Sequence, residues 1–332
     1  MSFRDIIGQE NVKEILREAV TTGRVGHAYM FLGSDGIGKL TVAKSFAEMI
    51  MCADMGANGE SCGVCKACLM NKNGSNPDIR IIDIPEKKTS IGVEPIREMQ
   101  EDVLTAPMYS SKKVYIIRHA EALSVAAQNV LLKTLEEPPA YVVIVLLCSN
   151  ISLMLDTVKS RVNRLDFARY TDDEIRQALM ERMLDPGDDK VVFSYADGIV
   201  GRAISYFQDD NINEVRESLL NVVTGLYKEG AEFRINATSY VIKQKDYKEF
   251  VFFTMMSFYR DIAMVARYGK YAEVQNPKHL DILTETAGKI GYYRSVKCIE
   301  LIDKTWLRIK QNTNYELAVG NMFIKLQEVL NG

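Results

Sequence analysis

The chain of 332 residues lacks a long hydrophobic run. Its longest apolar stretch, Tyr141 to Cys148, is far shorter than the roughly 20 residues that a membrane-spanning helix needs. The first residues, MSFRDIIGQE, carry charges where a secretory signal peptide has its apolar segment. We therefore expect a cytosolic protein without a membrane partner.

Proline is scarce, and so is an excess of either charge. With only 8 prolines, 47% hydrophobic residues and 26% charged residues, the composition excludes a long disordered or fibrous tract. The length predicts two or three domains of roughly 100–200 residues each. A formal net charge of -3 excludes a protein that coats nucleic acid with a globally basic surface. Any contact with DNA must come from a local patch, and we expect the main partners to be proteins.

The 6 cysteines are expected to be core residues or metal ligands, because disulfides are rare in the cytosol. Cys148 lies in the apolar run YVVIVLLC and Cys298 stands alone in SVKCIE, and both are typical of small buried residues. The other four follow the spacing C-x9-C-x2-C-x2-C and are Cys52, Cys62, Cys65 and Cys68. The x2 spacings let a tight loop turn several thiolates toward one point, so we predict a structural Zn²⁺. An iron–sulfur cluster and redox-active thiols are the alternatives.

Short apolar runs alternate with helical patterns in the first half of the chain. The runs lie at 28–32, 79–84, 114–117 and 142–147, with helical stretches near 92–105 and 124–137. This order predicts an α/β fold with a parallel sheet of the nucleotide-binding type. After Phe167 the strand signals fade, and Thr171-x-x-Glu174 is a capping box that predicts a helix and a new domain. From about residue 210 onward the pattern is helical throughout.

A glycine loop follows the first predicted strand. The segment GSDGIGK at 33–39 fits G-x-x-x-x-G-K, a pattern in which backbone N–H groups and a lysine hold nucleotide phosphates. The predicted phosphate contacts come from Gly33, Gly36, Gly38 and Lys39. ATP or ADP is therefore a possible ligand of this loop.

The residues that would support ATP hydrolysis are missing from their usual places. Leu40 stands where a Ser or Thr would hold Mg²⁺, so Mg²⁺ is not expected to be well held. Arg118 and His119 follow the strand at 114–117, where an acidic pair is usual. We interpret Glu121 as a solvated residue rather than as a substitute. The chain has no complete ATPase site, and nucleotide binding without hydrolysis and a vestigial loop remain equally open.

A series of motifs runs in a fixed order along the first 208 residues. They are IGQE at 7–10, RVGHAY at 24–29, the glycine loop, the four cysteines, NPD at 76–78, LLKTLEEPP at 131–139, SRV at 160–162 and GRA at 201–203. In this order they resemble the bacterial clamp-loader AAA+ subunits of DNA polymerase III. The remaining part of the chain resembles that family only in length and helical character.

The resemblance implies three domains: an AAA+ domain at 1–168 with a zinc module at about 52–78, a small helical lid at 169–210, and an all-α collar at 211–332 for oligomerisation. It implies a non-hydrolysing component of the DNA polymerase III holoenzyme, a nucleotidyltransferase complex. The implied partners are gamma/tau and delta subunits, primer-template DNA and, indirectly or weakly, the sliding clamp. Within the family, the alternative is an ATPase motor of the gamma/tau kind. A zinc-bearing DNA-binding module is a further alternative, but few basic residues lie near the cysteines.

Two arginines acquire roles only through this resemblance. Arg161 matches the arginine of a Ser-Arg-Cys motif that reaches into a neighbouring subunit's ATP site, with Val162 in place of the cysteine. From the sequence alone, Arg161 would be a solvated residue before a strand predicted at 163–167. Arg202 matches a second-sensor arginine that touches phosphate in active relatives, and its alternative is a domain-interface ion pair.

Overall fold

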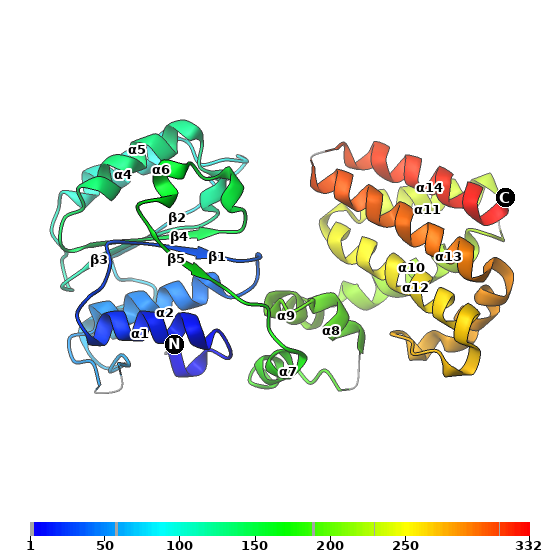
Figure 1. Cartoon of the computed structure of the whole chain (residues 1–332), viewed down its shortest axis with the longest axis horizontal. Coiled ribbons are helices and arrows are strands. Elements are labelled where there is room, and N and C mark those ends of the chain that lie inside the picture. Colours follow the sequence, from blue (N-terminus) through cyan, green and yellow to red (C-terminus); the bar gives the residue numbers. More distant parts are fainter. Residues whose placement is uncertain (1–2, 57–58, 188–189, 229, 312) are drawn as a thin grey trace. The chain divides into compact units, whose positions relative to one another are not determined.

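The computed structural model describes residues 3–56, 59–187, 190–228, 230–311 and 313–332 (Figure 1). The chain divides into two compact units. Unit 1 comprises Met1–Met183 with Gly198–Gly201, and unit 2 comprises Leu184–Asp197 with Arg202–Gly332. Among the described residues, no helix is both long enough and apolar enough to span a membrane. The finer division predicted at residues 168 and 210 stays a prediction.

A five-stranded parallel sheet forms the centre of unit 1 (Figure 1). Its strands are β1 (Ala28–Leu32), β2 (Ile79–Ile82), β3 (Lys113–Ile117), β4 (Val142–Cys148) and β5 (Asn163–Asp166), in the order β2-β3-β4-β1-β5. All neighbouring strands pair in parallel. Strands β3 and β4 are buried along their whole length, which explains why their sequences are apolar apart from Lys113, whose buried amine pairs with Asp102. The predicted α/β fold with a parallel sheet is confirmed.

Helices cover both faces of this sheet. In Figure 1, α1 (Glu10–Thr21) and α2 (Lys39–Met51) lie on one face, and α4 (Val93–Val103) and α5 (Val125–Glu136) lie on the other. The shorter helices of unit 1 are η1 (Phe3–Asp5), α3 (Lys66–Lys72), η2 (Ala120–Ala122), η3 (Ile151–Leu153), α6 (Asp156–Lys159) and α7 (Asp172–Met180). Helix α7 begins with the predicted capping box, in which Thr171 and Glu174 satisfy each other's backbone N–H groups.

Two polar anchors hold loops of unit 1 against the sheet. The side-chain amide of Gln9 donates to the carbonyl of Ala168 at 2.7 Å and accepts from its N–H at 3.0 Å. Asp78, which is 1% exposed, accepts hydrogen bonds from the backbone N–H groups of residues 108–110 and from the Ser110 hydroxyl. These bonds explain why the IGQE and NPD motifs need an amide and a carboxylate at positions 9 and 78.

Unit 2 is helical. Its helices are α8 (Lys190–Ala196), α9 (Val200–Gln208), α10 (Asn211–Gly225), α11 (Ala231–Lys243), η4 (Lys245–Tyr247), α12 (Lys248–Tyr268), η5 (Gly269–Tyr271), η6 (Pro277–His279), α13 (Leu280–Lys310) and α14 (Tyr315–Asn331). The first two residues of α9 belong to unit 1. Aromatic side chains such as Phe250, Phe258 and Phe323 fill the core of unit 2. The predicted all-helical C-terminal region is confirmed.

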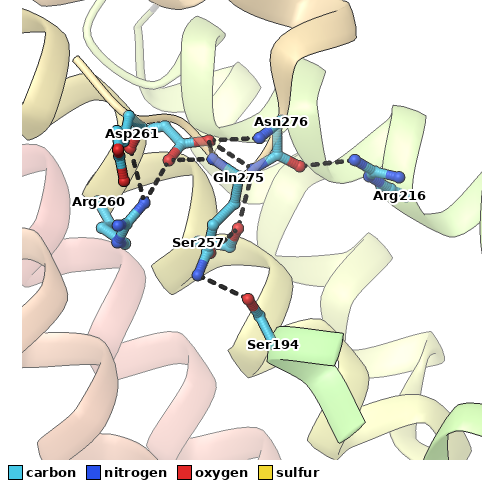
Figure 2. A network of polar contacts seen from close by, with 8 residues as sticks. Ser194, Arg216, Ser257, Arg260, Asp261, Gln275 and Asn276 are labelled. Carbon is cyan, nitrogen blue, oxygen red and sulfur yellow. Dashed lines mark hydrogen bonds and ion pairs between the residues drawn. The ribbon is translucent and has the colours of Figure 1, made fainter. Parts of the chain in front are cut away.

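A buried carboxylate organises one end of unit 2 (Figure 2). Asp261 on α12 is fully buried and accepts hydrogen bonds from the backbone N–H groups of Gln275 and Asn276 and from the Asn276 side chain. The Gln275 side-chain amide donates to the Ser194 hydroxyl of α8 at 2.9 Å. Arg216 of α10 donates to the Asn276 side-chain carbonyl at 2.7 Å. The bond between Gln275 and Ser194 joins α8 to the rest of unit 2.

Candidate phosphate loop, cysteine cluster and arginines

The glycine loop connects β1 to α2 and has the backbone that the motif requires. Gly36 and Gly38 take φ values of +81° and +100°, a region that residues with a Cβ rarely adopt. Lys39, the first residue of α2, is only 7% exposed. Its amine donates to the carbonyl oxygens of Gly33 and Ser34 and lies 3.3 Å from the Asp35 carboxylate. The lysine thus folds back onto its own loop.

Residues 198–201 cover this loop. The Gly201 N–H donates to the Gly36 carbonyl at 3.0 Å. A Cβ on Gly201 would lie 2.8 Å from that same oxygen, so the two backbones approach more closely than a side chain allows. A cavity lined by Ile6, Gly38, Tyr170 and neighbouring residues measures only about 50 Å³. Small-molecule sites are usually about 300–1,000 Å³, so a nucleotide would require this space to widen.

Basic residues occupy the end of β3, where an ATPase has its acidic pair. The Arg118 N–H donates to the Ile82 carbonyl, and its guanidinium lies 2.6 Å from the carboxylate of Asp83, which follows β2. The His119 ring lies 4.0 Å from that carboxylate, and its backbone takes a φ of +49°. Asp83 therefore pairs with the guanidinium of Arg118.

The sequence interpretation of Glu121 as a solvated residue is wrong. Glu121 is half-buried, and its carboxylate accepts hydrogen bonds from the backbone N–H and the hydroxyl of Ser149, which follows β4. Ligand atoms of Asp35, His119 and Glu121 lie within 4.8 Å of one another. The Lys39 amine already pairs with Asp35, so a positive charge is present at this acidic group without a metal.

The structure brings the four spaced cysteines together. Cys52 directly follows α2 and Cys68 lies on α3, and the Sγ atoms of all four cysteines lie within 4.8 Å of one another. The Cys62 N–H points to the Cys52 sulfur at 3.2 Å, and the Cys65 N–H points to the Cys62 sulfur at 3.3 Å. Zinc–sulfur bonds of about 2.3 Å give a tetrahedron with edges of about 3.8 Å. The donor set therefore fits zinc with small side-chain movements.

The thiols of this cluster differ in acidity. Burial raises the pKa of Cys68, and a hydrogen bond with Cys65 adds to the effect. Burial also acts to raise the pKa of Cys65, but hydrogen bonds from the Ala53 backbone and from Cys68 outweigh it and lower the pKa to about 6. One thiolate therefore forms readily near neutral pH, and thiolates are the form in which cysteine binds metals.

Arg161 lies between α6 and β5, and Arg202 lies on α9. The Arg161 side chain is 36% exposed, and its guanidinium lies 2.8 Å from the carboxylate of Glu136 at the end of α5. It also donates to the Thr157 carbonyl at 3.0 Å. Arg202 forms an ion pair with Glu249 of α12. The proposed phosphate contacts of both arginines stay predictions.

Comparison with known proteins decides the family. A family model described as "DNA polymerase III, delta subunit" matches residues 8–171, which include the sheet, the glycine loop and the four cysteines. The chain belongs to the clamp-loader AAA+ family. The order of sequence motifs and the parallel sheet agree with this assignment.

Relatives within the clamp-loader family carry two different names. Subunit tau of DNA polymerase III from Bacillus subtilis is 35% identical over 240 residues, which cover 67% of this chain and 40% of the relative. Subunit delta′ from the same organism is 29% identical over 260 residues, which cover 77% of this chain and 78% of the relative. This clamp-loader chain thus spans less than half of the tau relative and about four fifths of the delta′ relative.

A solved structure is similar along most of the clamp-loader chain. It is a gamma-subunit-related protein of DNA polymerase III from Thermotoga maritima, 19% identical, with a TM-score of 0.48 and coverage of 96% of this chain and 99% of that one.

Sequence reasoning missed the partners of several site residues. Glu136 stands two residues before Pro138 in the LLKTLEEPP motif, but nothing in its spacing to Arg161 indicates their ion pair. The packing of residues 198–201 onto the glycine loop is likewise a long-range contact. The four cysteines, by contrast, lie within 17 residues of chain, and their cluster was predictable from spacing.

Proposed function

We propose that the chain is the delta-prime subunit of a DNA polymerase III clamp loader. It would act as a non-hydrolysing AAA+ subunit that helps to load the sliding clamp on primed DNA. The observation that carries the proposal is the glycine loop whose catalytic surroundings are replaced: Leu40 follows Lys39, and Arg118 pairs with Asp83 at the end of β3. Hydrolysis needs a held Mg²⁺ and a positioned water, and these residues supply neither.

The phosphate loop itself supports a structural role. Lys39 bonds to carbonyl oxygens of its own loop, and Gly201 closes on Gly36. Both contacts stabilise the loop without any nucleotide. ATP or ADP would bind only after these contacts rearrange, and both nucleotide binding without hydrolysis and a vestigial loop are compatible with a subunit that does not turn over ATP.

The cysteine cluster would hold a structural zinc ion. The four thiolates would complete a tetrahedral shell, which leaves no open position for a reacting water. Bound zinc would join the end of α2 to α3 and so fix the segment that leads to β2. We infer a cytoplasmic location from the family and from the four free thiols of this cluster.

Arg161 would serve a neighbouring subunit. A guanidinium supplied in trans stabilises charge on the transferring phosphoryl group, and the partly exposed Arg161 side chain can reach outward if it leaves Glu136. The proposed partners are gamma/tau and delta subunits and primer-template DNA, with the sliding clamp contacted indirectly or weakly. Arg202, which pairs with Glu249, would be structural in this subunit.

A gamma/tau-like motor is the second candidate. Two observations favour it: the tau relative has the higher identity, and Glu121 lies near Asp35 and His119, where it could take part in holding a cation. The two candidates differ in one measurable property, which is ATP turnover by the chain alone.

Steady-state ATPase assays with Mg²⁺ would separate them. The isolated chain should show no turnover above that of Lys39→Ala, whereas a complex assembled with gamma/tau and delta subunits should hydrolyse ATP when primed DNA and clamp are added. Turnover by the isolated chain that disappears in Lys39→Ala would refute the delta-prime proposal and support a motor. Failure to co-purify with gamma/tau and delta would refute both.

A further inference from the structure

Exposed tyrosines and basic residues gather where α12 ends and α13 bends. Gly291 takes φ +71° and ψ 174° inside α13, so the helix changes direction there. Arg267 at the end of α12 lies 5.0 Å from the centre of the Tyr292 ring, which joins the two helices at this point. We call this surface the tyrosine patch. Its members are Arg267, Tyr268, Lys270, Tyr271, Tyr292, Tyr293 and Lys297.

The charged members of the tyrosine patch are all basic in a chain that is acidic overall, although exposed Glu273, Glu285 and Glu300 stand at the ends of its segments. The segments 262–272 and 286–299 contain five lysines and arginines and no aspartate or glutamate. The five are Arg267, Lys270, Lys289, Arg294 and Lys297. With a formal net charge of -3 for the whole chain, such a concentration of positive charge marks a local site for an anion.

The aromatic rings of the patch are open to solvent. Tyr271 is 79% exposed and Tyr293 is 69% exposed. Lysine amines lie 5.1 Å and 4.5 Å from the centres of these two rings. A flat ring beside a cation can stack on a nucleic-acid base while the cation approaches the adjacent phosphate.

We propose that the tyrosine patch binds single-stranded DNA. Aromatic rings interleaved with basic side chains form the usual platform for single strands, because every base has a face that can stack and every nucleotide carries a phosphate. In a duplex the bases are already stacked on one another, so the rings favour unpaired strands. The choice of DNA over RNA rests on the proposed clamp-loader function, but the surface itself is derived from unit 2 alone.

A subunit contact is the competing use of this patch, and its chemistry argues against that use. Tyrosine and arginine are common at protein interfaces, but lysine is depleted there, and this patch has two lysines, Lys270 and Lys297, whose charges have the same sign as that of Arg267. Exposed aliphatic side chains, which suit a protein contact better, lie elsewhere on unit 2. They include Ile235 on α11, Leu280 and Leu307 at the two ends of α13, and Leu317 and Ile324 on α14.

Fluorescence anisotropy with the purified full chain tests the proposal. The probes are oligo(dT) and oligo(rU) of about 30 nucleotides, a length that exceeds one typical single-strand site. We expect oligo(dT) to bind at low salt, to bind more tightly than a duplex of the same length, and to weaken as salt rises. Tyr293→Ala should weaken binding by about tenfold, and Tyr293→Phe should keep it because the ring remains. Lys297→Glu should also weaken binding and make it less dependent on salt.

Control variants separate the patch from general surface effects. Tyr109→Ala removes another exposed tyrosine, which lies 4.0 Å from the Lys66 amine in unit 1, and Lys325→Glu reverses an exposed charge on α14. Both should bind oligo(dT) like the unmodified chain. Equal binding by Tyr293→Ala and Tyr109→Ala, or no binding at low salt, would overturn the proposal. Tighter binding of oligo(rU) than of oligo(dT) would overturn the assignment to DNA.

Complex assembly distinguishes this inference from the proposed function. If Tyr293→Ala keeps oligo(dT) binding but no longer joins gamma/tau and delta subunits, the patch is a subunit contact and the inference is wrong. If the unmodified chain binds oligo(dT) but never joins those subunits, the proposed function fails and the binding surface stands.

Discussion

Replacing Arg161 by alanine tests the proposed action on a neighbouring subunit. The change removes a guanidinium that lies 2.8 Å from Glu136 and 3.0 Å from the Thr157 carbonyl. In a reconstituted clamp loader, we expect the complex to assemble normally but to hydrolyse ATP and load clamps more slowly.

The effect on folding should be small. The Arg161 and Glu136 side chains are 36% and 50% exposed, and an ion pair this open to water contributes about 0.2–1 kcal/mol. For a unit of this size, such a loss lowers the melting temperature by no more than about 4 °C. A large loss of function would therefore not result from unfolding.

The effect on hydrolysis should be much larger at the site that Arg161 serves. Arginines supplied in trans accelerate phosphoryl transfer by about 10³–10⁵-fold in GTPases, so the neighbouring site should become almost silent. Arg161→Lys should rescue poorly, because an ammonium lacks the planar pair of donors that matches phosphate oxygens.

Two controls isolate the guanidinium. Glu136→Gln breaks the same ion pair but keeps Arg161, so hydrolysis should persist. Arg164→Ala removes a nearby arginine of β5 that pairs with Asp166 at 2.8 Å, and it should leave both activities unchanged. The assays are DNA-stimulated ATP hydrolysis and clamp loading on primed DNA. Normal rates for Arg161→Ala would show that the arginine is only a partner of Glu136.

Three further predictions concern metal and stability. Elemental analysis of protein purified without a chelator should find one zinc ion per chain. The Cys65→Ser variant should lose the zinc ion, and the control Cys298→Ala should keep it. Iron in place of zinc would contradict the assignment. Asp78→Asn should lower the free energy of unfolding, measured in urea at neutral pH, by about 3 kcal/mol, because four donors lose their carboxylate. Burial acts to raise the pKa of Asp78, but the four donors outweigh it and hold the pKa below 3.8. The difference in unfolding free energy between the unmodified chain and Asp78→Asn should therefore be complete above pH 3.8 and shrink as the pH falls toward the pKa of the folded state. A difference that stays constant with pH would show that the ionised carboxylate is not its cause. Asp261→Asn should destabilise unit 2 by about 3 kcal/mol or more, whereas the control Asp303→Asn, on the exposed side of α13, should not destabilise it. Equal melting temperatures of these two variants would show that the buried network contributes little.

Local patterns in the sequence were enough to predict the fold class and the cysteine cluster. Buried parallel strands such as β4 must be apolar on both faces, and the glycines of the phosphate loop are required by its backbone. The spacing of four cysteines over a short segment limits how far apart their sulfurs can lie. Each of these features depends on residues that are close in the chain, so the sequence alone determined them.

Only the tertiary structure decided which distant charges meet. Glu121 bonds to Ser149 across the strand ends, Arg161 pairs with Glu136, and Asp261 collects donors from the loop before α13. The tyrosine patch likewise depends on a long-range contact, in which Arg267 at the end of α12 meets Tyr292 directly after the bend at Gly291. A charged side chain pairs with many possible partners at similar energy, so its sequence neighbours do not identify the partner. The packing of the helices and strands determines which partner lies within reach.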